Sequence, residues 1–228
     1  MKKILETLQR KWTEYLLEIL VIMIGILGAF ALNNWQESRE EKFEETQVLK
    51  ELRESLLYDL DQNISRDIPL VRGDIALCQT ILNNIEEGIY HIDSINYLFL
   101  SRYTTFNPKY IAYKSLENMG IDLIKNDSLK NVIVEIYDFE YPMLKNRIEQ
   151  NDFARLTGFT RPFIREHFYV NGQNKLAPID VISLYKNHEF KQLVFFIMST
   201  RNNRLRQRLH LVSMIEKVIN QINLELSE

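Results

Sequence analysis

Residues Ile19–Leu32 read ILVIMIGILGAFAL, 14 residues in a row without a polar side chain. With its flanks, from Tyr15 to Trp35, the segment gives about 31 Å of helix at 1.5 Å per residue, which matches a hydrocarbon core of roughly 30 Å. Trp12 and Tyr15 lie at one edge and Trp35 at the other, where aromatic belts are expected. The stretch therefore predicts a transmembrane helix over residues 15–35.

Two other structures would account for the same apolar run. A helix buried in a protein core could also contain 14 apolar residues. A cleaved signal peptide is suggested by Ala29-Phe30-Ala31, which has the small-x-small pattern of a cleavage site. However, the preceding residues include Glu6, Glu14 and Glu18, and no Pro or Gly follows until Pro69. A helix that continues through the cleavage site favours a signal-anchor that is retained.

Basic residues on the two sides of the span predict its orientation. The N-terminal side has four and the next 15 residues have three, namely Lys2, Lys3, Arg10 and Lys11 against Arg39, Lys42 and Lys50. By the positive-inside rule, residues 1–14 form a cytoplasmic tail and residues 36–228 form a periplasmic domain of a bacterial inner-membrane protein. Within the tail, Ile4, Leu5, Leu8 and Trp12 share one helix face. They form either a short amphipathic helix on the membrane surface or the start of the transmembrane helix.

The composition of the chain favours an all-α domain after the anchor. Only 7 Gly and 5 Pro occur in 228 residues, too few for a turn-rich β fold. A net charge of −3 provides no general attraction for nucleic acid, so no nucleic-acid partner is expected. The single cysteine, Cys78, cannot form an internal disulfide.

Two long amphipathic helices dominate the predicted domain. One continues from the anchor, with apolar positions at Val48, Leu49, Leu52, Leu56, Leu57, Leu60 and Ile64. The other spans about 187–226, with apolar positions at Leu193, Phe196, Ile197, Leu205, Leu209, Val212, Ile215, Val218, Ile219 and Ile222. Antiparallel pairing of these two helices would bury both apolar faces, which predicts a helical bundle.

Turn and capping residues divide the segment between them. They predict helices over Pro69–Glu87, ended by Gly88, and over Lys109–Asn118, ended by Gly120. A short helix ending at Leu98 would be capped by Asp93 or Ser94. A longer one begins after Asn126 and runs, bent at Pro142, to Leu156. A break at Thr157–Gly158, a helix over Arg161–Tyr169 and a turn at Asn171-Gly172 complete the prediction.

Two stretches resemble a family of uncharacterised, membrane-anchored proteins from Gram-negative bacteria, classified as a domain of unknown function. One stretch is EILVIMIGIL at 18–27 with ALNNW at 31–35, and the other is AYKSLENMG at 112–120 with LIKNDSL at 123–129. Met119 departs from the small polar residue that the family has before Gly120. The resemblance implies an inner-membrane anchor with a helical domain outside it, and it implies no catalytic residue.

The anchor contains two candidate contact sites. Glu18 is an ionisable residue at the membrane edge, where it either pairs with a partner or reaches the headgroup region. Gly25 and Ala29 form a small-xxx-small pair with Gly28 beside it, and this pattern permits close packing of membrane helices. The expected partners are therefore the lipid bilayer and either a second copy or another membrane protein.

One basic cluster lies in the predicted last helix. Arg201, Arg204 and Arg208 share a helix face and could contact phosphates or anionic headgroups. The alternative is a solvated face whose arginines pair with glutamates. The four histidines lack metal-ligand spacing, and no phosphate-binding loop or nucleophile motif is present, so neither a cofactor nor an enzyme activity is expected.

The sequence thus predicts a non-enzymatic, membrane-anchored interaction or scaffold protein of the bacterial envelope. The alternative is a sensory or ligand-binding domain that signals through a membrane partner. The sequence identifies no ligand for that domain.

Overall fold

The computed structural model describes the backbone of residues 2–90, 95–103 and 105–227, and their side chains except those of 2–11, 13–15, 147 and 148. Contacts divide the chain into two units, residues 1–47 and 48–228. Helix α1 (Lys2–Tyr58) belongs to both units and contains no break at Ala31. The prediction of one helix through the possible cleavage site is therefore confirmed.

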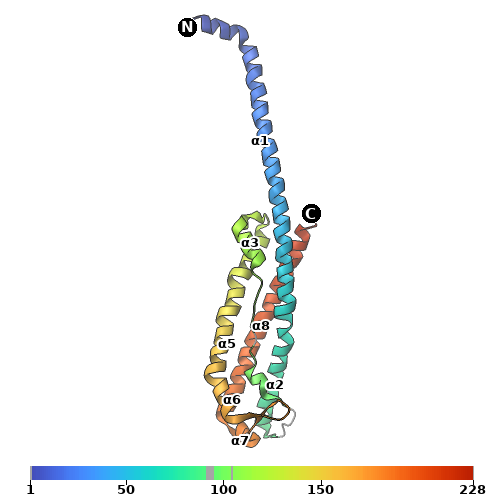
Figure 1. Ribbon diagram of the computed structural model, residues 1–228, viewed down its shortest axis with the longest axis vertical. Coiled ribbons are helices and arrows are strands. Elements are labelled where there is room, and N and C mark those ends of the chain that lie inside the picture. Colours follow the sequence, from blue (N-terminus) through green and yellow to red (C-terminus); the bar gives the residue numbers. More distant parts are fainter. Residues whose placement is uncertain (1, 91–94, 104, 228) are drawn as a thin grey trace. The chain divides into compact units, whose positions relative to one another are not determined.

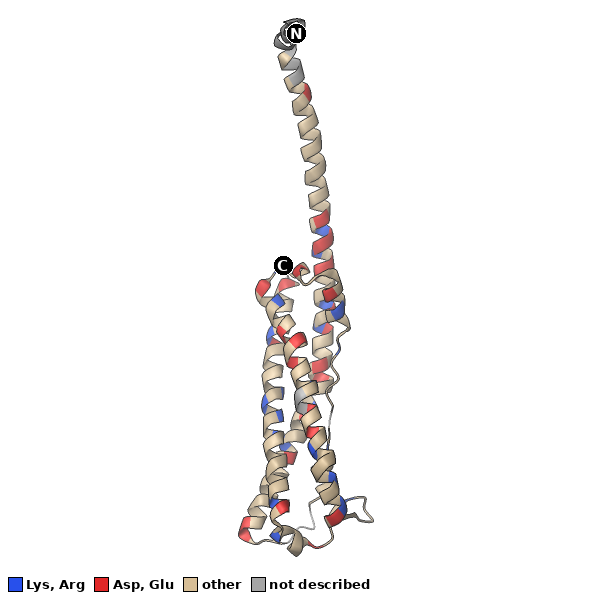
Figure 2. Ribbon diagram, turned by 90° about the vertical axis from the view of Figure 1, so that its left-hand side faces the viewer, with Lys and Arg blue, Asp and Glu red and all other residues tan. Residues whose placement is uncertain are grey.

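The apolar part of α1 is exposed within this chain. Every side chain from Leu16 to Glu40 is exposed, and Asp, Glu, Lys and Arg are absent from the stretch 19–36 (Figure 2). The alternative of a core helix buried by its own chain is therefore wrong. Among the described residues, this one helix is long and apolar enough to cross a membrane. The predicted amphipathic face of the first 14 residues lies, apart from Trp12, on side chains outside the described ones.

The second unit is a bundle of three long helical runs, at residues 48–87, 127–167 and 188–225 (Figure 1). The all-α prediction is confirmed. Its α-helices, in chain order after α1, are α2 (Asp67–Glu87), α3 (Ile111–Met119), α4 (Asp127–Val134), α5 (Gln150–Arg155), α6 (Arg161–His167), α7 (Val181–Lys186) and α8 (His188–Glu225). Wider π-helical stretches join them at Asp59–Ser65, Glu135–Glu140, Met143–Glu149 and Leu156–Thr160, and 3₁₀ turns lie at Tyr97–Ser101 and Ile121–Leu123.

The first and last runs pack antiparallel, as predicted. Contacts between them join residues whose numbers rise in one run and fall in the other: Arg53 with Asn223, Asp67 with Arg204, and Glu86 with Lys191. Buried side chains from both runs form one apolar cluster, which includes Leu52, Leu56, Leu211, Ile215 and Val218. Burial of these apolar faces is what holds the two runs together.

Most predicted helix ends are confirmed by their capping geometry. Gly88 ends α2 in the left-handed conformation, with φ of 68°, and Gly120 follows α3 with φ of 103°. Asn126 accepts a hydrogen bond from the Leu129 N–H at the start of α4, and Asn187 accepts from the Glu189 N–H at the start of α8. Each cap satisfies a backbone group that the first or last helical turn leaves unpaired.

Three details between residues 89 and 186 differ from the predictions or escape them. The break at Thr157–Gly158 is wrong, because the run continues to His167 and buries Leu156 and Phe163, which offsets the low helix propensity of Gly158. Tyr169 lies in strand β1 (Phe168–Val170), which pairs antiparallel with β2 (Leu176–Pro178) across the predicted Asn171-Gly172 turn. Helix α7 was not predicted, and the proposed cap at Asp93 or Ser94 lies outside the described residues.

Candidate functional site

The buried stripe of α8 passes through arginines in its middle. Leu209, predicted to be buried, is 42% exposed, whereas the buried positions recur at intervals of three and four through Ile197, Arg201, Arg204, Arg208, Leu211, Ile215, Val218 and Ile222. The expectation of a solvated arginine face is therefore wrong. The three arginines do share one face, as predicted, but that face points into the bundle.

Asp67 of α2 is the first partner of these arginines. One of its carboxylate oxygens, Oδ2, accepts hydrogen bonds from Arg204 Nε at 2.9 Å and from Arg208 Nε at 3.2 Å. All three side chains are buried. Burial lowers the pKa of Arg208, and the neighbouring Asp67 carboxylate counteracts that fall. One carboxylate thus compensates two buried guanidinium groups.

Asp74, one helical face further along α2, pairs with Arg201 and Arg102. Arg201 Nε lies 3.3 Å from Asp74 Oδ2, and Arg102, which follows the 3₁₀ turn, forms an ion pair with Asp74 Oδ1. Burial raises the pKa of Asp74, and the charges of Arg102 and Arg201 oppose that rise. The loop after residue 101 is thereby tied to both α2 and α8.

The middle run supplies the remaining carboxylates, Glu149 and Asp152. Glu149 accepts a hydrogen bond from the Phe106 N–H and lies 3.9 Å from Arg208 Nη2. Asp152 Oδ2 lies 3.8 Å from both Arg201 Nη1 and Arg204 Nη1, yet it is buried without a hydrogen bond among the described residues. Burial raises the pKa of Glu149, while Phe106 and Arg208 oppose the rise.

These eight side chains form an ion layer, consisting of Asp67, Asp74, Arg102, Glu149, Asp152, Arg201, Arg204 and Arg208. It lies between two separate apolar clusters of the bundle, one containing Leu52 and Ile215 and the other containing Phe163 and Phe190. The sequence analysis missed its five residues outside α8. The available signal was the spacing Asp67, Val71, Asp74, Cys78, which repeats at four and three like an apolar stripe.

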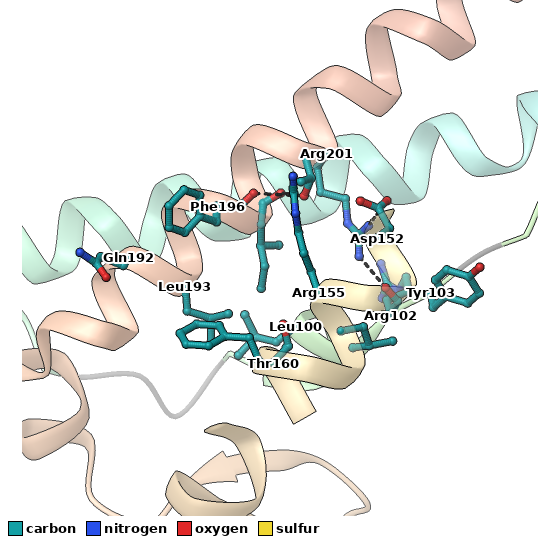
Figure 3. A pocket seen from close by; sticks show the side chains of 14 residues that line it. Leu100, Arg102, Tyr103, Asp152, Arg155, Thr160, Gln192, Leu193, Phe196 and Arg201 are labelled. Atoms are coloured by element: carbon teal, nitrogen blue, oxygen red, sulfur yellow. Dashed lines mark hydrogen bonds and ion pairs between the residues drawn. The ribbon is translucent and has the colours of Figure 1, made fainter. Parts of the chain in front are cut away.

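A cavity of about 400 Å³ opens beside one end of the ion layer (Figure 3). Its volume is within the range of roughly 300–1,000 Å³ that is usual for small-molecule sites. Its floor contains the buried side chains Leu100, Leu156 and Leu193, and the half-exposed rings of Phe159 and Phe196 stand at its rim. We call this cavity the apolar chamber. It is lined by Leu100, Arg102, Tyr103, Asp152, Arg155, Leu156, Phe159, Thr160, Gln192, Leu193, Phe196, Ile197, Thr200 and Arg201.

A second cavity of about 410 Å³ adjoins the apolar chamber and has the opposite character. We call it the polar groove, and it is lined by Met143, Asn151, Asp152, Arg155, Ser199, Thr200, Asn203, Arg206 and Gln207. Asp152, Arg155 and Thr200 line both cavities. The two cavities are therefore adjacent parts of one site between α5 and α8.

The other predicted site residues lie on α1. Glu18, Gly25, Gly28 and Ala29 are exposed, and no atom lies within 4 Å of a Cβ built on either glycine. Their predicted contacts with a partner helix stay predictions. Among the described residues, no three His, Cys, Asp or Glu side chains are grouped as metal ligands. Burial raises the pKa of the Cys78 thiol to about 12, which keeps it protonated and unreactive.

A separate buried carboxylate, Asp59, organises the first apolar cluster. It accepts hydrogen bonds from the Tyr141 hydroxyl at 3.0 Å, from the Lys109 N–H at 3.1 Å and from Asn63 Nδ2 at 2.8 Å. These donors come from all parts of the cluster, and the carboxylate is fully buried. Asp59 therefore has a structural role, because its own chain occupies its acceptor positions.

The stability of the protein is expected to depend on pH through Asp59. Burial raises the pKa of Asp59 above its ordinary value of 3.8, although its hydrogen bonds oppose the rise. Since the folded state binds this proton more tightly, the stabilisation from Asp59 is complete below pH 3.8 and is lost as pH rises through the raised pKa. Urea unfolding of the wild type and Asp59→Asn across this pH window measures it. The wild type should lose its relative stability as pH rises, and a gain would contradict the prediction.

Comparison with protein-family models, curated proteins and solved structures gives no match to this chain. The resemblance of the anchor to the uncharacterised bacterial family therefore stays a prediction from the sequence.

Proposed function

We propose that this chain is a non-enzymatic, membrane-anchored ligand-binding protein whose helical domain holds an amphipathic small molecule. The observation that carries this proposal is the apolar chamber, which joins a buried leucine floor to a wall containing Arg102, Asp152 and Arg201. Concave sites with mostly apolar walls and a few polar groups are typical of small-molecule binding. The scaffold role that the sequence favours has no comparable feature among the described residues.

The proposed location is the bacterial inner membrane, with residues 1–14 in the cytoplasm and the ligand-binding domain in the periplasm. The length and exposure of the apolar part of α1 support the anchor, and the basic residues before it support the orientation. Because α1 continues without a break to Tyr58, a signalling partner in the membrane could sense the bound state through this helix. Gly25, Ala29 and Glu18 are the proposed contact residues for such a partner or for a second copy.

Photo-crosslinking tests the ligand-binding proposal directly. The full-length protein in lipid nanodiscs is titrated with an alkanol that carries a diazirine group, and labelled peptides are identified by mass spectrometry. We expect saturable labelling of residues 155–160 and 192–201, which line the apolar chamber. Labelling of the anchor alone, or labelling that does not saturate, would overturn the proposal.

Replacing Phe196 by Ala is expected to weaken alkanol binding about tenfold, because a half-buried ring contributes roughly 1–1.5 kcal/mol of apolar contact. Phe195→Ala is the matched control. The two rings are 55% and 53% exposed and are adjacent on α8, but only Phe196 lines the apolar chamber. The concentration of alkanol that gives half-maximal labelling measures the effect. Equal weakening by both substitutions would show that the chamber is not where the alkanol binds.

A further inference from the structure

The apolar chamber and the polar groove require different chemistry from one ligand. The chamber has leucine, isoleucine and phenylalanine side chains on most of its surface, whereas the groove has asparagine, glutamine, serine, threonine and arginine. The two share Asp152, Arg155 and Thr200 as a common wall. A molecule that occupies both must have an apolar part and a polar part joined at this wall.

The charge of the joined site selects the polar part. The cavities are lined by four arginines, namely Arg102, Arg155, Arg201 and Arg206, and by a single acidic residue, Asp152. Arg102 and Arg201 are already paired with Asp74 behind the chamber wall. Asp152 directs its buried Oδ2 toward Arg201 and Arg204 in the ion layer. The remaining two arginines therefore decide the charge that the groove offers to a ligand.

Arg155 and Arg206 have no hydrogen-bond or ion-pair partner within the described part of the chain, and both are exposed. They stand on opposite walls of the groove, Arg155 on α5 and Arg206 on α8. Figure 3 shows the Arg155 side chain extending from α5 toward α8 at the edge of the chamber. Two planar guanidinium groups on facing walls are suited to the oxygens of a phosphate or carboxylate.

Resting on the proposed function, we infer that the ligand is a single-chain anionic amphiphile. Its alkyl chain occupies the apolar chamber and its phosphate or carboxylate lies between Arg155 and Arg206. The chamber volume of about 400 Å³ leaves room for one chain, since it is near the lower end of the roughly 300–1,000 Å³ range for small-molecule sites. A cationic or metal ligand is disfavoured by the excess of arginines. The same chemistry is offered by a fatty acid in solution and by a lysophospholipid in a bilayer.

Competition against the diazirine alkanol tests this inference on the full-length protein in nanodiscs. Dodecanol and dodecyl phosphate have the same chain and differ in charge. We expect dodecyl phosphate to compete about tenfold more strongly or better, because two charge-assisted hydrogen bonds are added at a partly exposed site. In the double variant Arg155→Gln/Arg206→Gln, dodecyl phosphate should lose that advantage while dodecanol competes as before. Arg165→Gln, which removes an exposed arginine of α6 outside both cavities, is the control and should change nothing.

The outcomes separate this inference from the proposed function. If dodecanol competes and dodecyl phosphate is no better, or if the double variant keeps the preference, the inference is overturned and the ligand-binding proposal stands. If the alkanol does not label the chamber at all, the proposed function itself fails.

A further arm distinguishes the two sources of the ligand. Dodecanoate is added in solution, and lysophosphatidic acid is supplied in phosphatidylcholine vesicles. Stronger competition by dodecanoate supports a soluble fatty acid, and stronger competition from the vesicles supports a lipid taken from the membrane. Failure of both to compete would overturn the inference.

Discussion

Replacing Asp67 by Asn is expected to lower the free energy of unfolding by about 3–5 kcal/mol, the usual effect of removing one partner of a buried ion pair. Asp67 Oδ2 is the nearest acceptor for both Arg204 and Arg208. With Asn in its place, Arg204 would depend on Asp152 at 3.8 Å and Arg208 on Glu149 at 3.9 Å. Since domains are typically stable by about 5–15 kcal/mol, this change is a large fraction of the total.

Denaturant unfolding of the full-length protein in detergent, followed by circular dichroism, measures the effect of Asp67→Asn. Asp61→Asn is the matched control, because Asp61 lies six residues earlier in the same helical run and is exposed. It should change the unfolding free energy by less than about 0.5 kcal/mol, as is usual for surface substitutions. If the two variants unfold at the same denaturant concentration, the ion layer does not contribute as the contacts indicate.

Replacing Leu52 by Ala is expected to destabilise the bundle by about 2–5 kcal/mol, because the substitution removes buried methyl groups and leaves a cavity. Leu52 is fully buried in the cluster that joins the first run to α8. Leu57, five residues later in α1, was predicted to face the same core, but it is 44% exposed. The same substitution at these two positions therefore compares a core leucine with a half-exposed one in the same helix.

Thermal unfolding of Leu52→Ala and Leu57→Ala provides the measurement. Leu52→Ala should melt at a clearly lower temperature than the wild type, and Leu57→Ala should differ little from it. The reverse order would mean that the register of the first run against α8 differs by about one residue from the one described. Either result reports on the antiparallel pairing that the sequence predicts.

The predictions from local sequence succeed where the signal is contained within a few turns of helix. Gly88, Asn126 and Asn187 end or begin helices as expected, because each supplies a backbone conformation or a cap that its immediate neighbours need. The break at Thr157–Gly158 fails because a glycine lowers helix propensity by only about 1 kcal/mol, which packing of Leu156 and Phe163 can offset. Local propensity thus decides ends more reliably than continuity.

The sequence by itself determined the long apolar helix, the all-α class and the antiparallel pairing of the first and last runs, since apolar periodicity specifies which faces must be covered. The tertiary structure alone decided that Arg201, Arg204 and Arg208 are buried. A charged residue in a helix stripe reads as solvent-facing unless its partner is known, and Asp67 is 137 residues from Arg204 in the chain. The apolar chamber and the polar groove likewise arise only where α5 and α8 meet, because their walls come from segments that no local pattern connects.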